Sequence, residues 1–156
     1  MKFTGQFTGV TLDTRAWQAQ LRSHLEAKLN EGAKAWLHGV TGRVPVWSGM
    51  SQASLLKLSE MIGGTIVISP RSGVKNRIPQ GRALGSAVKV ISDTDFTITI
   101  ITQVPHYTYQ EYNKPARGGS PSAPWFSQFA GNEAFRAVAN DVVVPPLIFK
   151  PVVKTI

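Results

Sequence analysis

The feature that most constrains the fold is a long apolar stripe near the N-terminus. Between residues 13 and 38, large apolar residues recur at steps of three and four, namely Trp17, Leu21, Leu25, Leu29, Ala33 and Trp36 or Leu37. This period predicts one amphipathic α-helix, capped by Thr11 or Asp13 and stopped by Gly39. At 1.5 Å per residue the helix is roughly 39 Å long. It therefore has to lie across a sheet or a neighbouring molecule.

Two further helices are predicted from leucine spacing and from capping residues. The first covers residues 51–61, with Ser48 or Ser51 as its cap and Gly63 at its end. The second opens near residue 122 and runs to about residue 140, with a proline in its first turn, where the missing N–H costs nothing. These helices flank a central stretch of different periodicity.

That central stretch predicts strands. Residues 65–69 and 87–91 are rich in β-branched side chains, and residues 95–102 and 106–112 alternate with a period of two. The turn sequence SDTD joins the second and third of these segments. Consecutive strands with short links favour an antiparallel sheet of about four strands. The order of elements predicts an α+β fold, with the long helix and the short second helix packed on the sheet.

The last residues form a tail of unusual composition. The sequence VVVPPLIFKPVVKTI is strongly apolar, yet its three prolines oppose both a helix and a place inside a sheet. We therefore expect one domain over residues 1–140, closed by the C-terminal helix, and an extended apolar tail over residues 141–156. A tail of this kind invites association with other copies. The candidate residues for that interface are Val143, Leu147, Ile148, Phe149 and Val152.

Catalytic and metal chemistry find little support in the sequence. The chain has no cysteine, and its three histidines are not spaced as metal ligands. Trp47-Ser48-Gly49 lacks the first glycine of a hydrolase nucleophile elbow, so a helix cap is the simpler interpretation of the serine. We expect a non-enzymatic protein without metal or cofactor. Without a signal peptide or a membrane-length apolar run, it is expected to be made in the cytoplasm.

The positive charge is concentrated in one segment. The net charge is +8, and no acidic residue occurs between Glu60 and Asp93. A Gly/Pro-containing loop within residues 71–89 carries the basic side chains Arg71, Lys75, Arg77 and Arg82. These side chains can contact DNA phosphates or an acidic protein neighbour, and a solvated hairpin tip is the plain alternative. A small basic DNA-binding protein that uses this loop is the second functional hypothesis.

Aromatic residues are concentrated around a Pro/Gly/Ser loop. All three tyrosines lie between residues 106 and 112, and Pro124-Trp125-Phe126 follows the loop. Tyrosine and tryptophan are large, rigid and partly polar, which is why protein interfaces favour them. Together with the apolar tail and the long helix, these aromatics favour subunit assembly over a catalytic or nucleic-acid-stacking role.

Three motifs, in order, resemble the tail-completion and head–tail-joining (neck) proteins of tailed bacteriophages. Residues 45–55, PVWSGMSQASL, are similar to a family motif P-V-D-T-G-x-L-x-x-S-I through Pro45, Ser48 and Gly49. Residues 106–113, HYTYQEYN, are similar to Y-A-x-Y-V-E-F-G through Tyr109, Glu111 and Tyr112. The third motif resembles the P-F-L that opens the last helix of the family, and it consists of Pro124, Trp125 and Phe126.

The resemblance implies a structural virion protein at the junction of head and tail. It implies a six-fold or twelve-fold homo-oligomeric ring that joins the portal or connector to neighbouring tail proteins. Any contact with passing DNA would be non-specific, and no membrane is involved. The basic loop and the C-terminal tail lie outside the three motifs, so the resemblance assigns them no role.

Overall fold

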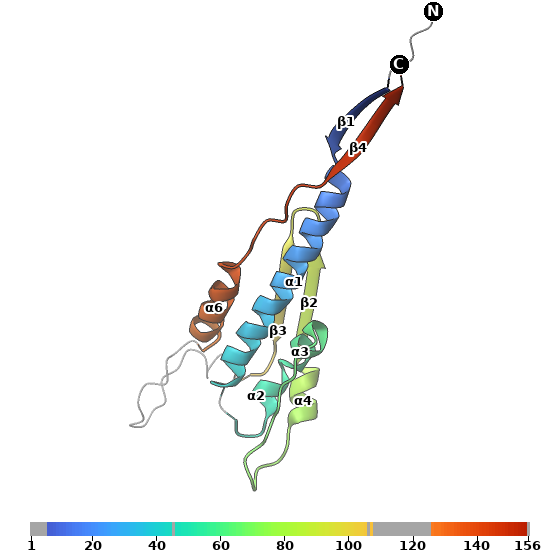
Figure 1. The fold of residues 1–156 in the computed structure, drawn as a ribbon. Helices are drawn as coiled ribbons and strands as arrows, with labels where there is room; N and C mark the ends of the chain where they lie inside the picture. The colour runs from blue at the N-terminus through green and yellow to red at the C-terminus, as the bar shows by residue number, and fades with distance from the viewer. Residues whose placement is uncertain (1–5, 45, 106, 108–125, 156) are drawn as a thin grey trace, which may run out of the picture.

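The structure is a computed structural model that describes residues 6–44, 46–105, 107 and 126–155. It is a mixed helix and strand fold with a long N-terminal helix and a small antiparallel sheet, as the sequence predicts (Figure 1). The elements in chain order are β1 (Gln6–Leu12), α1 (Thr14–Thr41), α2 (Met50–Ala53), α3 (Leu56–Ile62), α4 (Ile78–Ala83), β2 (Gly85–Ile91), β3 (Phe96–Thr102), α6 (Phe126–Ala139) and β4 (Phe149–Thr155).

Helix α1 starts where the sequence predicts and ends later. The Asp13 carboxylate accepts a hydrogen bond from the Ala16 backbone N–H at 3.0 Å, which confirms the predicted cap. The predicted stop at Gly39 is wrong, because the helix continues to Thr41 and Gly42 is the C-cap. The extra turn carries Val40, which is fully buried. Burial of that side chain outweighs the weak helix propensity of the glycine before it.

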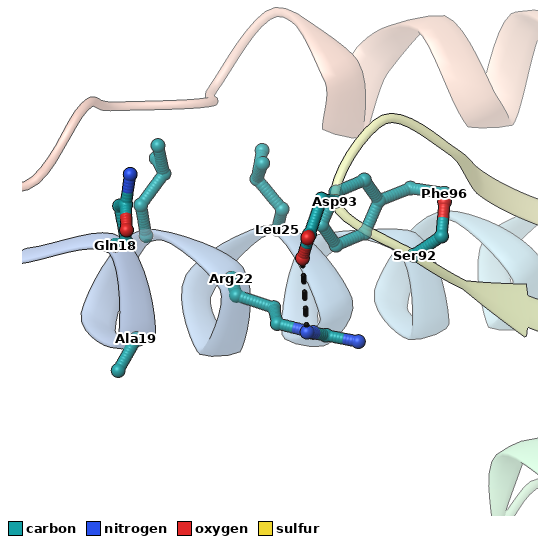
Figure 2. Close-up of a pocket in the computed structure, with 8 residues that line it drawn as sticks. Gln18, Ala19, Arg22, Leu25, Ser92, Asp93 and Phe96 are labelled. Carbon is teal, nitrogen blue, oxygen red and sulfur yellow. Dashed lines mark hydrogen bonds and ion pairs between the residues drawn. The ribbon is translucent and has the colours of Figure 1, made fainter. Parts of the chain in front are cut away.

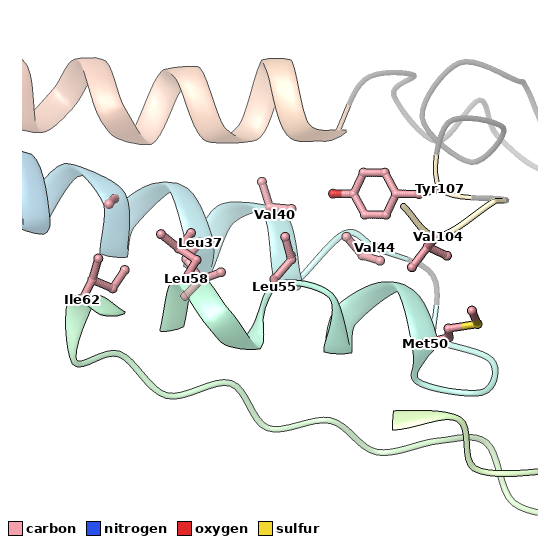
Figure 3. Packing of buried hydrophobic residues seen from close by; sticks show 10 residues of the cluster. Leu37, Val40, Val44, Met50, Leu55, Leu58, Ile62, Val104 and Tyr107 are labelled. Atoms are coloured by element: carbon pink, nitrogen blue, oxygen red, sulfur yellow. The ribbon is translucent and has the colours of Figure 1, made fainter. Parts of the chain in front are cut away.

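The hydrophobic core lies at the C-terminal half of α1 (Figure 3). The side chains that share it come from α1, from the α2–α3 region and from the segment after β3, and include Leu37, Val40, Val44, Leu55, Leu58, Ile62, Val104 and Tyr107. The N-terminal half of α1 is covered less well, since Leu21, Leu25 and Leu29 are only half-buried. The long helix therefore extends beyond its own core.

The predicted helix over residues 51–61 is two short helices. Between α2 and α3, the Ser54 hydroxyl donates to the Ser51 carbonyl at 2.8 Å, a local bond that competes with a continuous helix. The predicted serine cap is also wrong, because the N-cap of α2 is Gly49, at φ +77° and without a side-chain hydrogen bond. Gly63 ends α3 at φ +64°, as predicted.

The sheet differs from the prediction of four consecutive strands. Strands β2 and β3 pair antiparallel as predicted, from Gly85 opposite Thr102 to Ile91 opposite Phe96. Residues 65–69 are extended but form no strand ladder within the described part of the chain. Their alternating exposure arises because Ile66 packs against the core while its neighbours face outward. The predicted strand 106–112 lies outside the described residues, apart from Tyr107, which is buried.

A second two-stranded ladder joins the two ends of the chain. Strands β1 and β4 pair antiparallel over their full length, from Gln6 opposite Thr155 to Leu12 opposite Phe149. The expectation that prolines keep the tail out of a sheet is therefore wrong for its last residues. Pro151 is tolerated because both strands of a two-stranded ribbon are edge strands. In Figure 1 this ribbon continues beyond the N-terminal end of α1, away from the core.

Candidate assembly surface

The β1–β4 ribbon has one apolar face. In an antiparallel pair, directly opposite residues project to the same side. The register places six uncharged residues on one side, defined here as the apolar ribbon face: Thr8, Val10, Leu12, Phe149, Pro151 and Val153. All six are exposed, with 76% of Val10 and 60% of Val153 accessible. The other side has Lys150 opposite Thr11, so the ribbon is amphipathic.

Contacts near Asp13 fix the ribbon to α1. The Asp13 backbone N–H donates to the Ile148 carbonyl at 2.7 Å, and the Trp17 indole N–H donates to the Pro145 carbonyl at 3.1 Å. The Lys150 ammonium lies 3.6 Å from the Asp13 carboxylate. The hydrogen bond from Ala16 lowers the pKa of Asp13, and the Lys150 charge acts in the same direction against the opposing effect of desolvation.

The interface residues predicted in the tail do not share one environment. Val143, Leu147 and Phe149 are exposed by 69%, 55% and 58%, which suits an interface. Ile148 and Val152 are half-buried instead. Sequence reasoning missed Val10 and its neighbours in β1, although residues 6–12 are rich in the strand formers Phe, Thr and Val and could have been recognised as a strand.

A groove follows α1 on the side of β3 and α6. It consists of two cavities of about 440 Å³ and about 330 Å³ that share Phe96. The first lies beside Leu21 and Leu25 and is shown in Figure 2, where Arg22 bridges to Asp93 at 3.3 Å. The second lies beside Leu29 and is lined mainly by apolar side chains: Ala33, Trp36, Ile98, Ile100 and Phe135. We call both cavities together the α1 groove.

Close packing of α6 on α1 forms one wall of the second cavity. A Cβ atom added at Gly32 would lie 2.9 Å from Cδ2 of Phe135, so only glycine allows α6 to approach this closely. Phe135 is 42% exposed and lines the second cavity. The second cavity is thus a consequence of how the last helix packs on the first, whereas the first cavity lies between α1 and residues 92–96.

The predicted basic loop is more ordered than its composition suggests. It contains helix α4. At the start of this helix, the side-chain carbonyl of Asn76 accepts a hydrogen bond from the Ile78 N–H at 2.9 Å. Gly81 packs against the backbone of Met50, which holds α4 on α2. A Gly/Pro-containing segment was expected to lack structure, but a glycine without a side chain is what permits this close helix contact.

The four basic residues predicted to contact DNA or an acidic partner fall into two pairs with different surroundings. The Arg71 guanidinium lies 5.0 Å from the centre of the Trp47 ring, and Arg82 pairs with Glu60 at 2.6 Å. Lys75 and Arg77 are exposed, and the described part of the chain offers neither of them an ion-pair partner. Lys75 and Arg77 are therefore the two of the four that could bind a phosphate or a carboxylate without giving up such a contact within the described residues.

Two of the family-motif residues lie close to this basic segment. The Ser48 carbonyl accepts a hydrogen bond from the Arg77 N–H at 3.0 Å, and Gly49 packs against Ile78 and Ile68. Phe126 is the first residue of α6. The remaining motif positions lie outside the described residues: Pro45, Tyr109, Glu111, Tyr112, Pro124 and Trp125.

Within the described ranges, no group of three His, Cys, Asp or Glu side chains is arranged to hold a metal ion. None of the helices in that part of the chain combines the length and apolarity needed to cross a membrane. No protein-family model, no curated protein and no solved structure matches the chain.

Proposed function

We propose that this chain is a structural subunit of a tailed-bacteriophage virion. It forms a homo-oligomeric ring at the neck and joins the portal or connector to the tail. The single observation that carries the assembly part of this proposal is the apolar ribbon face, whose six side chains are all exposed.

The energetic case for a partner rests on this face. Burial of one Val, Leu or Phe side chain contributes about 1.5–3 kcal/mol. Val10, Phe149 and Val153 together therefore represent a substantial free energy that the isolated chain does not gain. A two-stranded ribbon is also marginally stable in water by itself. Contact with a second molecule would stabilise the ribbon and remove its apolar face from water.

The assignment to a phage neck is supported by the three sequence motifs. A ring subunit needs surfaces that bind its neighbours rather than a catalytic centre. Ser48 and Gly49 lie where α2 meets the basic segment, so the first motif has a structural role in positioning α4. Pro45 of the same motif lies outside the described residues.

Mass measurement of the full-length protein tests the proposal. Light scattering across a wide concentration range, alone and with the portal and tail proteins of the same phage, should give a closed oligomer or a stable complex with one partner. Electron microscopy of the same sample should show rings. A compact monomer at high concentration that binds neither partner would overturn the proposal.

A further inference from the structure

We propose that the apolar ribbon face of one copy lies in the α1 groove of the next copy. This inference rests on the self-association in the proposed function and assigns the two surfaces that meet. It makes the ring contact heterologous, with a different surface contributed by each of the two neighbours.

The groove has the length and the chemistry for such a ribbon. It follows α1 from Gln18 to Trp36, which is roughly 27 Å at 1.5 Å per residue. A seven-residue strand such as β1 or β4 spans roughly 23 Å. The leucines along the groove recur at intervals of four residues and are half-buried, so the groove presents a partly uncovered apolar stripe.

Charge also favours this match. The apolar ribbon face has no charged residue, and in the α1 groove Arg22 and Asp93 neutralise each other at 3.3 Å. With its apolar face in the groove, the ribbon would direct the side that carries Lys150 toward water. Insertion would then remove water from no unpaired charge among these residues. Such loss of hydration is the main cost of burying charges in an interface.

The ribbon does not cover the groove of its own chain. Asp13 links the ribbon directly to the first turn of α1, and Figure 1 shows the ribbon continuing away from the helix rather than folding back along it. A return to its own groove would have to break the Asp13 cap and the bond from Trp17 to Pro145. A neighbouring copy can supply the ribbon without either loss.

Symmetric stacking of two ribbons is the competing arrangement. It would cover both apolar ribbon faces but would leave both α1 grooves open, whereas insertion of a ribbon into a groove covers both surfaces. A heterologous contact of this type continues from copy to copy and gives a ring where its rotation closes. The structure therefore favours insertion over ribbon stacking.

Thiol cross-linking can distinguish the two arrangements because the natural chain has no cysteine. We would place one cysteine on the ribbon by Val10→Cys and one in the groove by Asn132→Cys, since Asn132 is exposed and lines the second cavity. With a short bis-maleimide, a mixture of the two full-length variants should give a covalent dimer containing one chain of each. Lys57→Cys, on the exposed side of α3, serves as the control for random collision.

A complementation experiment provides the second measurement. Val10→Glu blocks the ribbon and Asn132→Glu blocks the groove, so neither variant alone should form more than monomers. Their mixture retains one natural ribbon and one natural groove and should form dimers that do not extend. Ribbon-to-ribbon cross-links, or complete oligomers without the mixed product, would overturn this inference and leave the ring proposal in place. Monomers of the natural protein at every concentration would overturn this inference, and monomers that also bind neither the portal nor the tail protein would overturn the ring proposal as well.

Discussion

Lys150 Nζ lies 3.6 Å from Oδ2 of Asp13, so the residue that caps the first helix also contacts the last strand. The other carboxylate oxygen accepts the Ala16 N–H at 3.0 Å. The start of α1 and the end of the chain are thereby joined at one side chain. Because the ribbon extends from this point, the cap also sets the direction in which the apolar ribbon face is presented.

Substitution of Asp13 should separate its two contributions to folding stability, one as the N-cap of α1 and one as the ion-pair partner of Lys150. Asp13→Ala removes the cap and the charge, and should lower the thermal unfolding midpoint. Asp13→Asn keeps a good N-cap but loses the attraction to Lys150, so its effect should be smaller. Thermal denaturation followed by circular dichroism at neutral pH measures both variants. An Asn variant as unstable as the Ala variant would show that the charge, rather than the cap, is decisive.

The pH dependence of stability follows from the same residue. The pKa of Asp13 is lowered in the folded protein, first by the Ala16 hydrogen bond and also by Lys150. A lowered pKa means that the stabilisation is fully present above the unfolded value, about 3.9, and is lost as the pH falls through the folded pKa. Denaturation midpoints measured from pH 6 downward should converge for the natural protein and Asp13→Ala. Parallel curves would contradict this assignment.

Gly49 should be intolerant of any side chain. It lies at φ +77°, and an added Cβ would come within 2.9 Å of Ile78 and 3.0 Å of Ile68. Gly73 has nearly the same φ, +76°, but open space around it. Gly73→Ala should therefore cost about 1–2 kcal/mol through backbone strain, and Gly49→Ala should cost more. Urea denaturation measures both, and equal losses would mean that the contacts around Gly49 relax freely.

The sequence predicted correctly the features that residues close together in the chain determine. The cap at Asp13 and the stripe on α1 are local features, and so is the turn in which Ser92 Oγ accepts the Asp95 N–H at 2.9 Å. The pairing of β1 with β4 joins the two ends of the chain, and no short window of sequence contains both partners. The prolines in the tail argued against a strand, because the sequence alone does not show that this strand lies at a sheet edge, where proline is tolerated.

Composition was misleading where tertiary packing determines the structure. The β-branched side chains of residues 65–69 predicted a strand, but Ile66 packs on the core without a strand ladder in the described part of the chain. Gly81 indicated a loose loop, yet it allows α4 to pack against α2. The second cavity of the α1 groove depends on the position of α6, which Gly32 allows to approach α1 and which helix periodicity does not specify.

The DNA-binding hypothesis now depends mainly on Lys75 and Arg77. For a neck subunit we expect only weak binding to arbitrary duplex at physiological salt. Lys75→Gln with Arg77→Gln should reduce the slope of log affinity against log salt by about 2, since each phosphate contact contributes roughly 0.9. Arg71→Gln with Arg82→Gln is the matched control, because these side chains already contact Trp47 and Glu60. Tight binding that survives physiological salt would favour the dedicated DNA-binding protein.

A glutamate introduced on either face of the ribbon should distinguish the apolar ribbon face from the opposite face. Val10→Glu places a carboxylate on the apolar ribbon face, whereas Thr11→Glu places it one residue later on the opposite face, directly across from Lys150. Both positions are exposed, so neither variant should lose more than about 0.5 kcal/mol of folding stability.

Self-association should nevertheless differ sharply between them. Val10→Glu would have to bury a charge without a partner and should weaken association by at least tenfold, since the cost exceeds 1.4 kcal/mol. Thr11→Glu keeps its charge in water beside Lys150 and should assemble as the natural protein does. Sedimentation velocity at matched concentrations measures both. Equal assembly of the two variants would show that the apolar ribbon face is not the contact surface, because a one-residue shift along a strand changes only the side to which the charge points.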